Sequence, residues 1–329
     1  MEISIIIPAY NSAATLGKLL DSIYRTTSDL VTAGKLKFEV IVVDDGSTDN
    51  TPALVAKYPA RLIRQPNGGP ALARNHGAKE AKYGFLLFFD SDVIVLDDTI
   101  KEVIASFADK TIDAVNGRYC KESANKGFFQ TYKTLMDFYL FKDYIRSYEK
   151  FDSRVAAIKK EVFFKAGGFD ARIRGATYEN EEFGYRLSSA YVNVFNPKIQ
   201  VMHHFPDFKR LVKSHYRRSF DWLQLFLQRK KFDSTLTTKK LGIATALAPL
   251  IVLFLILSFV EKAFLYITFL ALAAYIALYF GFYMFVLREK GLVTSILVFL
   301  TTYFFSLIVC TAGFLSLIDY MTKGRVLKI

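Results

Sequence analysis

The chain has 329 residues, of which 52% are hydrophobic, yet it carries a formal net charge of +12. This length leaves room for one domain of about 200–250 residues and a second region. Residues 241–318 are almost entirely apolar, whereas residues 207–240 hold ten Lys and Arg against three Asp, a net charge of +7. Basic charge placed directly before an apolar region favours anionic lipid head groups, so we expect no nucleic-acid partner.

The two cysteines and the start of the chain bear on its compartment. Cys120 and Cys310 lie far apart in the sequence, so a disulfide framework is not indicated. The first apolar run, residues 3–7, ends at Pro8 and is too short for the hydrophobic part of a signal peptide. We therefore expect the first domain to remain on the cytoplasmic side of a membrane.

The first 205 residues alternate apolar strands with helices. Strands are predicted at 3–7, 38–43, 61–64, 85–89, 192–195 and 199–203, and helices at 13–24, before residue 57, at 71–81 and at 182–190. Residues 117–150 lack a clean period, and we interpret them as helical. Apolar strands separated by helices indicate an α/β domain with a parallel sheet covered on both faces. Ligands in such domains bind at the carboxyl ends of the strands, where the polar clusters of this half fall.

The last third of the chain divides into three apolar stretches, 241–260, 263–287 and 292–318. Each is close to the roughly 20 residues that cross a bilayer, so we predict an integral membrane protein with a transmembrane region at 241–329. The basic segment 206–240 suits an amphipathic helix at the membrane interface, and contact with the acceptor is an alternative role. Three crossings would put the last basic residues outside, against the positive-inside tendency, so a re-entrant third segment remains open.

Two pairs of carboxylates follow predicted strands. Asp90 and Asp92 come after the strand at 85–89 and, being two residues apart, can present both carboxylates to one divalent cation. The alternative is a solvated loop. Asp44 and Asp45 occupy the equivalent place one strand earlier, although their sequence is also that of a turn followed by a helix cap.

These motifs have a recognisable order and spacing. They are Ile5–Asn11, Val42–Asp49, Gly69–Gly77 and Phe89–Asp92, continued by Gly167–Asp170 and Glu179–Leu187. Together they resemble the family 2 glycosyltransferases of the GT-A fold over about the first 205 residues. The resemblance implies a Rossmann-like GT-A domain with a mostly parallel sheet at 1–205, in front of the α-helical transmembrane region.

The resemblance also implies a donor site. The residues expected to bind the nucleotide-sugar donor are Pro8, Tyr10, Asp44, Asp45, Arg74 and Asp90. Asp90 and Asp92 match the family's metal motif, so Mn²⁺ or Mg²⁺ is the expected cofactor, stabilising the departing nucleoside diphosphate. His203 ends a predicted strand where GT-A enzymes place a third metal ligand or a phosphate contact. A structural histidine is the alternative for that position.

The run Glu179-Asn180-Glu181-Glu182 resembles the family's acidic motif. In inverting members the catalytic base is an Asp at the position of Asn180, and an amide cannot accept a proton. Either Glu179 or Glu181 takes this role, or the enzyme does not use such a base. Inversion and retention therefore both remain open, and a solvated helix start is the structural alternative for the run.

The expected function follows from these features together. It is the metal-dependent transfer of a sugar from a nucleotide sugar, with a uridine-linked donor favoured, to a lipid-linked glycan or polyprenyl phosphate at the cytoplasmic face of a membrane. The alternative is a non-catalytic, membrane-bound module that binds sugar nucleotides or serves assembly. Asn180 supports that alternative, whereas the intact Asp pairs oppose it.

Overall fold

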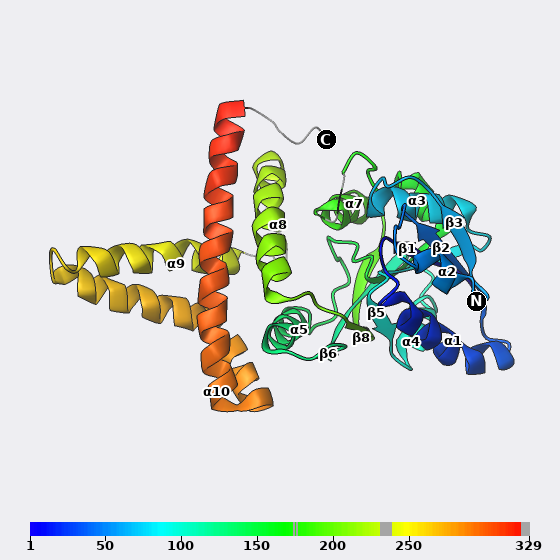
Figure 1. Ribbon diagram of the computed structural model, residues 1–329, viewed down its shortest axis with the longest axis horizontal. Coiled ribbons are helices and arrows are strands. Elements are labelled where there is room, and N and C mark those ends of the chain that lie inside the picture. The colour runs from blue at the N-terminus through cyan, green and yellow to red at the C-terminus, as the bar shows by residue number, and fades with distance from the viewer. Residues whose placement is uncertain (174, 176, 231–238, 324–329) are drawn as a thin grey trace. The chain divides into compact units, whose positions relative to one another are not determined.

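The computed structural model describes residues 1–173, 175, 177–230 and 239–323, and the chain divides into two compact units, Met1–Phe205 and Pro206–Ile329 (Figure 1). Residues 231–238 of the predicted basic segment, and the C-terminal Arg325 and Lys328, lie outside the described residues.

The first unit is built on an eight-stranded sheet with the order β3-β2-β1-β4-β7-β6-β8-β5. The strands are β1 (Glu2–Ala9), β2 (Lys37–Asp44), β3 (Arg61–Arg64), β4 (Phe85–Phe89), β5 (Val93–Val95), β6 (Ala114–Ser123), β7 (Val155–Lys159) and β8 (Asn193–His203). The neighbours β3, β2, β1 and β4 are parallel, as are β6 and β8. Antiparallel pairing is confined to β7 with its two neighbours and to β5 with β8. The predicted mostly parallel α/β sheet is confirmed.

Helices cover both faces of this sheet. They are α1 (Leu16–Thr32), α2 (Thr51–Val55), α3 (Pro70–Glu80), α4 (Thr99–Ser106), α5 (Phe128–Leu140), α6 (Lys160–Lys165) and α7 (Glu179–Ser188). Successive side chains of a strand point to opposite faces, so Ile5 and Ile7 of β1 join the core under α1 and α4, whereas Ile6 joins the core under α3 and α7 (Figure 1). Each fully buried Ile contributes about 1.5–3 kcal/mol to folding.

Some predicted elements have different bounds. The first helix extends eight residues beyond the predicted end because Thr26 and Thr27 turn their hydroxyls back onto helix carbonyls and Leu30 continues the buried stripe. The prediction of helix throughout 117–150 is wrong for its first part, which forms β6 in the centre of the sheet, and α5 is shorter than predicted.

The second half of the sheet also differs from the prediction. The two short strands predicted at 192–195 and 199–203 form one strand, β8, which runs through Pro197 with an irregular register against β6. The helix predicted from Glu182 begins three residues earlier, so the acidic run forms the first turn of α7. This earlier start suits the positive end of a helix dipole, where carboxylates are stabilised.

The second unit is helical, with α8 (Phe208–Arg229), α9 (Lys239–Leu257) and α10 (Ala263–Lys323). Residue Gly291 has φ of 81°, outside the helical range, and divides α10 into two helical segments. The predicted stretches 263–287 and 292–318 lie in these segments, but the first continues through the charged residues 288–290 because only Gly291 breaks the helix. By length and composition, α9 and α10 could each cross a membrane.

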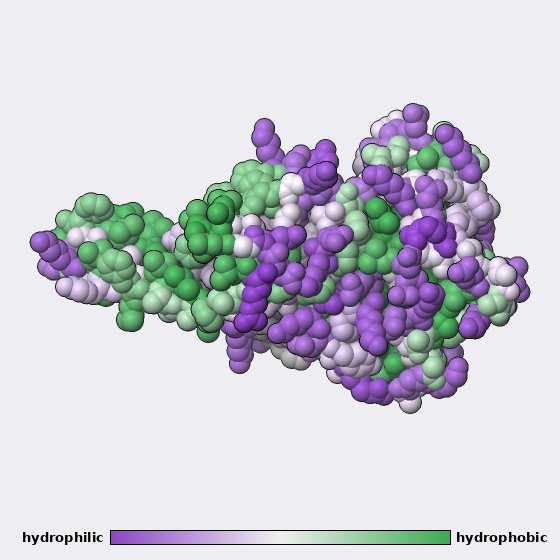
Figure 2. Space-filling view, turned by 90° about the horizontal axis from the view of Figure 1, so that it is seen from below, coloured by the Kyte–Doolittle hydropathy of each residue, from purple (hydrophilic) through white to green (hydrophobic). Residues whose placement is uncertain are grey.

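Contacts within the second unit fix the course of its helices. The Phe254 and Phe264 rings stack at 6.1 Å between centroids, so α9 and the first segment of α10 lie side by side as an arm (Figure 1). The second segment of α10 runs across the base of this arm, where Tyr303 donates a hydrogen bond to the Ala248 carbonyl at 2.8 Å. On its other side it packs along α8, through the rings of His215 and Phe305 at 4.3 Å. Figure 2 shows the arm as mostly hydrophobic along its length, with hydrophilic residues at its tip.

Candidate active site

The loops after β1, β2 and β4 meet at one edge of the sheet. Asn11, with φ of 49°, accepts a hydrogen bond at its side-chain oxygen from the backbone nitrogen of Thr48 at 2.8 Å. The hydroxyls of Ser12 and Ser91 lie 2.8 Å apart, which joins the first loop to the turn that carries Asp90 and Asp92. The carboxyl ends of parallel strands share one edge, so motifs that are distant in the sequence form one site.

The carboxylates of Asp44 and Asp45 both accept hydrogen bonds from other groups of the protein. Asp45 accepts hydrogen bonds from the backbone nitrogens of Gly68 at 2.9 Å and Gly69 at 2.8 Å, which fixes the loop before α3. Asp44 is fully buried, accepts from the Ser47 backbone nitrogen at 3.0 Å and pairs with Arg64. In this arrangement the pair fixes the loops at this edge of the sheet, and its predicted contact with a nucleotide-sugar donor stays a prediction.

Tyr10, the aromatic residue predicted to bind the nucleotide-sugar donor, is exposed, unlike Asp44 and Asp45. Tyr10 is 51% exposed, so its ring has a free face on which a nucleotide base can stack. Pro8 is buried within β1 opposite Val43 and supports this loop from below.

Arg74 connects two parts of the site. Its guanidinium donates to Asp90 Oδ1 at 2.7 Å and lies 3.4 Å from Glu179 Oε1. The side chain is only 4% exposed and lies over the ring of Phe169, 5.4 Å from its centroid. A buried guanidinium between two carboxylates fixes their separation, so Arg74 positions the end of β4 against the first turn of α7.

Asp92 is held by a residue from the far end of the chain's first unit. The pairing of β5 with β8 puts Val93 opposite His203, and His203 Nε2 lies 3.2 Å from Asp92 Oδ2. Burial acts to raise the pKa of Asp92, but the nearby imidazole of His203, through its charge and hydrogen bond, lowers this pKa below its usual value. The His203 ring packs against Tyr119 and Phe205 with centroids 4.5 and 4.4 Å apart.

The metal expectation can be compared with this geometry. Asp90 and Asp92 keep 29% and 42% of their side chains exposed and offer the oxygen ligands that Mn²⁺ and Mg²⁺ accept. Within the described ranges, no three His, Cys, Asp or Glu side chains are arranged to hold a metal ion. His203 Nε2 nevertheless lies 3.2 Å from Asp92 Oδ2, so two of the three predicted ligands are adjacent. The assignment of Asp90, Asp92 and His203 as metal ligands stays a prediction.

The side chains of Glu179, Asn180 and Glu181 contact different partners. Glu179 is 3% exposed and, besides Arg74, accepts from the Thr177 backbone nitrogen at 2.8 Å. Asn180 accepts from the Ser153 hydroxyl at 2.8 Å. Glu181 is 20% exposed and lies 3.4 Å from the Lys150 ammonium. Residues one apart on a helix diverge by about 100°, which accounts for the separate partners.

Three buried residues of this site were not predicted from the sequence. Lys150 is 1% exposed beside Glu181, and Arg154 packs over Tyr119, 4.4 Å from its ring centroid. Arg154 also pairs with Asp152 at 3.1 Å. Lys150 ends the stretch without a clean period and Asp152 and Arg154 follow it directly, and in the sequence nothing distinguishes these charged residues from surface charges.

Gly184 allows α7 to approach the segment that carries Lys150. A Cβ atom at this position would lie 2.3 Å from Lys150 Cα and 2.5 Å from the Phe151 nitrogen, which are backbone atoms. We expect Gly184→Ala to lower the free energy of unfolding by about 1–3 kcal/mol, because overpacking exceeds the gain in helix propensity. Thermal unfolding measures this, with Gly84→Ala as control, since a Cβ at Gly84 meets nothing within 4 Å. Equal melting temperatures for the two variants would contradict the expectation.

A family model described as glycosyl transferase family 2 matches residues 4–179, more than half of the chain. The chain belongs to this family, and the resemblance found in its motifs is confirmed.

Two curated relatives illustrate the range of the family. Poly(ribitol-phosphate) beta-N-acetylglucosaminyltransferase TarS of Staphylococcus aureus is 36% identical over 140 residues, which are 38% of this chain and 23% of TarS. Glycosyltransferase GlyG of Streptococcus pneumoniae is 32% identical over 142 residues, 41% of this chain and 45% of GlyG. The chain thus spans less than half of the length of these two relatives.

A solved structure extends the likeness along the chain. The mannosyltransferase PcManGT from Pyrobaculum calidifontis, in complex with GDP-Man and Mn²⁺, matches 98% of this chain and 87% of its own, with a TM-score of 0.57 and 19% identity. At this identity the likeness concerns the fold.

Proposed function

We propose that this chain transfers a sugar from a nucleotide-sugar donor, uridine-linked by preference, to a membrane-associated acceptor that is a lipid-linked glycan or a polyprenyl phosphate. The observation that carries the proposal is the convergence of Asp90, Asp92 and the first turn of α7 at one sheet edge, where Arg74 links Asp90 to Glu179. Within a glycosyltransferase family, this edge is where donor and acceptor would meet.

The residues of the site have separate tasks in this reaction. A divalent cation held by Asp90 and Asp92 would supply charge stabilisation to the leaving diphosphate. Arg74 fixes Asp90, and His203 fixes Asp92, so both carboxylates are oriented before the donor binds. Tyr10 offers a ring to the base. A carboxylate of the first turn of α7 would take the proton of an acceptor hydroxyl.

The apolar helices support a membrane location. Large apolar side chains are exposed along both segments of the arm, among them Leu253 and Ile256 of α9 and Phe269 and Leu270 of α10. Exposed apolar surface of this extent costs free energy in water and is stabilised in hydrocarbon. The basic α8 then belongs at the head-group level, with the first unit on the cytoplasmic side.

We propose two crossings rather than three. The second segment of α10 packs along α8, where the Ser316 hydroxyl donates to the Phe220 carbonyl at 2.7 Å. Because α8 carries Lys209, Arg210, Lys213, Arg217 and Arg218, a crossing by its companion would draw these charges into hydrocarbon. In this topology α9 crosses the membrane, the first segment of α10 crosses back, and the second segment of α10 lies at the membrane interface. This topology keeps the basic C-terminal residues on the cytoplasmic side.

The two topologies predict opposite sides for the C-terminal end of α10. With two crossings, a cysteine introduced at Thr322 in a background lacking Cys310 and Cys120 stays inaccessible to an impermeant thiol reagent in intact cells and reacts after permeabilisation. A cysteine at Lys262, at the exposed tip of the arm, is the control and reacts in intact cells. Labelling of both positions from outside would favour three crossings.

A donor screen tests the proposed activity. The full chain, reconstituted in lipid vesicles with a membrane lipid extract and Mn²⁺, is incubated with uridine- and guanosine-linked sugars, and both nucleotide release and the lipid product are measured. We expect release with a uridine-linked donor and a glycosylated lipid. Nucleotide binding without release or product would favour the non-catalytic module.

A further inference from the structure

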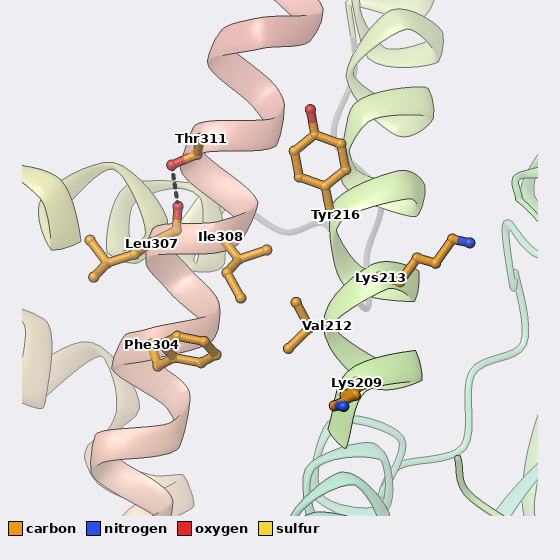
Figure 3. Close-up of a pocket in the computed structure, with 8 residues that line it drawn as sticks. All are labelled: Lys209, Val212, Lys213, Tyr216, Phe304, Leu307, Ile308 and Thr311. Carbon is orange, nitrogen blue, oxygen red and sulfur yellow. Dashed lines mark hydrogen bonds between the residues drawn. The ribbon is translucent and has the colours of Figure 1, made fainter. Parts of the chain in front are cut away.

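A groove lies within the second unit, between α8 and the second segment of α10. It has a volume of about 450 Å³ and is lined by Lys209, Val212, Lys213, Tyr216, Phe304, Leu307, Ile308 and Thr311 (Figure 3). On each helix the four lining residues follow the spacing i, i+3, i+4, i+7, so two continuous helix faces oppose each other. Figure 3 shows Val212 and Ile308 directed toward the space between the helices.

Contacts at both ends keep the two helices together around this groove. The rings of Phe208 and Phe304 lie 5.8 Å apart at one end, and Ser316 donates to the Phe220 carbonyl at 2.7 Å at the other. The lining of α8 between them runs from Lys209 to Tyr216, eight residues that span about 10 Å of helix. The groove therefore has the length and apolar walls for part of one hydrocarbon chain.

Charge complementarity defines the head group of the occupant. Lys209 and Lys213 border the groove one helical turn apart on α8, and both are exposed. In Figure 3 the Lys213 side chain extends away from α10, so its ammonium meets a head group over the groove only when this flexible side chain turns. The polar group of Thr311 is already engaged, since its hydroxyl donates to the Leu307 carbonyl at 2.9 Å. The charged groups available to a ligand head group are therefore the two lysine ammonium groups, and these favour a phosphate.

We propose that this groove binds one anionic phospholipid of the surrounding bilayer, with its phosphate at Lys209 and Lys213 and one acyl chain along the apolar walls. The proposal rests on the membrane location given under the proposed function. The bound lipid joins α8 to α10 and holds both helices at the level of the head groups.

The chain's single tryptophan, Trp222, lies on α8 six residues beyond Tyr216 and reports on lipid bound along this helix. The full chain is reconstituted in phosphatidylcholine vesicles that contain phosphatidylglycerol with brominated acyl chains, and quenching of Trp222 fluorescence is compared with that by brominated phosphatidylcholine. We expect the phosphatidylglycerol to quench at about tenfold lower mole fraction, because each lysine near a phosphate contributes several-fold to binding.

Variants distinguish lipid binding in the groove from a general effect of positive charge. Lys209→Gln with Lys213→Gln is expected to abolish the preference for phosphatidylglycerol. The matched pair Lys239→Gln with Lys240→Gln, which removes the same charge at the start of α9, is expected to retain it. Val212→Phe with Ile308→Phe fills the groove without changing charge and is expected to lower the quenching. Equal losses in both lysine pairs, or full quenching in the filled variant, would overturn the proposal.

Two further readouts distinguish the possible failures. Displacement of the brominated lipid by polyprenyl phosphate but not by unlabelled phosphatidylglycerol would overturn the phospholipid assignment. A chain that floats with vesicles and releases nucleotide from its donor, yet shows no lipid preference, refutes the groove alone. A chain that does not float refutes the membrane location and the groove with it.

Discussion

Replacing Asp92 or Asp90 by Ala is expected to reduce glycosyl transfer by about 10²–10³-fold or more, because each change removes a proposed ligand of the cation that would stabilise the leaving diphosphate. Both side chains are partly exposed at a loop, so the fold should persist. The measurements are nucleotide release, Mn²⁺ binding by calorimetry and thermal unfolding. Binding of Mn²⁺ should be lost in parallel with transfer.

A matched control lies on the same segment. Asp97 has a side chain that is 74% exposed and pairs with Arg25 at the surface, so Asp97→Ala should leave both transfer and Mn²⁺ binding close to those of the unaltered chain. Full transfer in the presence of EDTA, in the unaltered chain or in either aspartate variant, would refute the metal assignment.

Glu181→Gln is expected to lower kcat by about a hundredfold or more, because a positioned base contributes about 10²–10⁴-fold to the rate. Glu179 and Glu181 differ in access. Glu179 is 3% exposed and tied to Arg74, whereas Glu181 is 20% exposed and can be reached by an acceptor. Glu179→Gln should therefore leave kcat near that of the unaltered chain while lowering the melting temperature, since Arg74 loses one of its two charged partners.

Asn180, which lies between Glu179 and Glu181, offers a complementary test. Asn180→Asp should be tolerated, because an aspartate oxygen can still accept the hydrogen bond from the Ser153 hydroxyl. The new carboxylate could raise the rate with hydroxyl acceptors. Near-normal turnover of both Gln variants would mean that no base acts at this turn, and a phosphate acceptor or a retaining reaction would then fit better.

The sequence by itself determined the fold class, the family and the motifs of the site. Fully apolar strands such as 85–89 can be predicted from the sequence, because burial on both faces of the sheet excludes polar residues. For the same reason Asp90 marks the end of this strand. The apolar stretches after residue 240 are equally easy to recognise in the sequence, since few structures other than membrane helices contain apolar runs of this length.

Only the tertiary structure decided which charges meet. The contact of His203 with Asp92 depends on β5 pairing with β8, although the two residues are more than a hundred positions apart in the sequence. Arg74 lies between Asp90 and Glu179 because α3 and α7 cover the same face of the sheet. Ionic contacts of this kind have no period in the sequence, because they arise from the spatial order of strands and not from local propensity. For the same reason, the course of α10 after Gly291 followed from its packing against α8 and α9, which hydropathy alone does not encode.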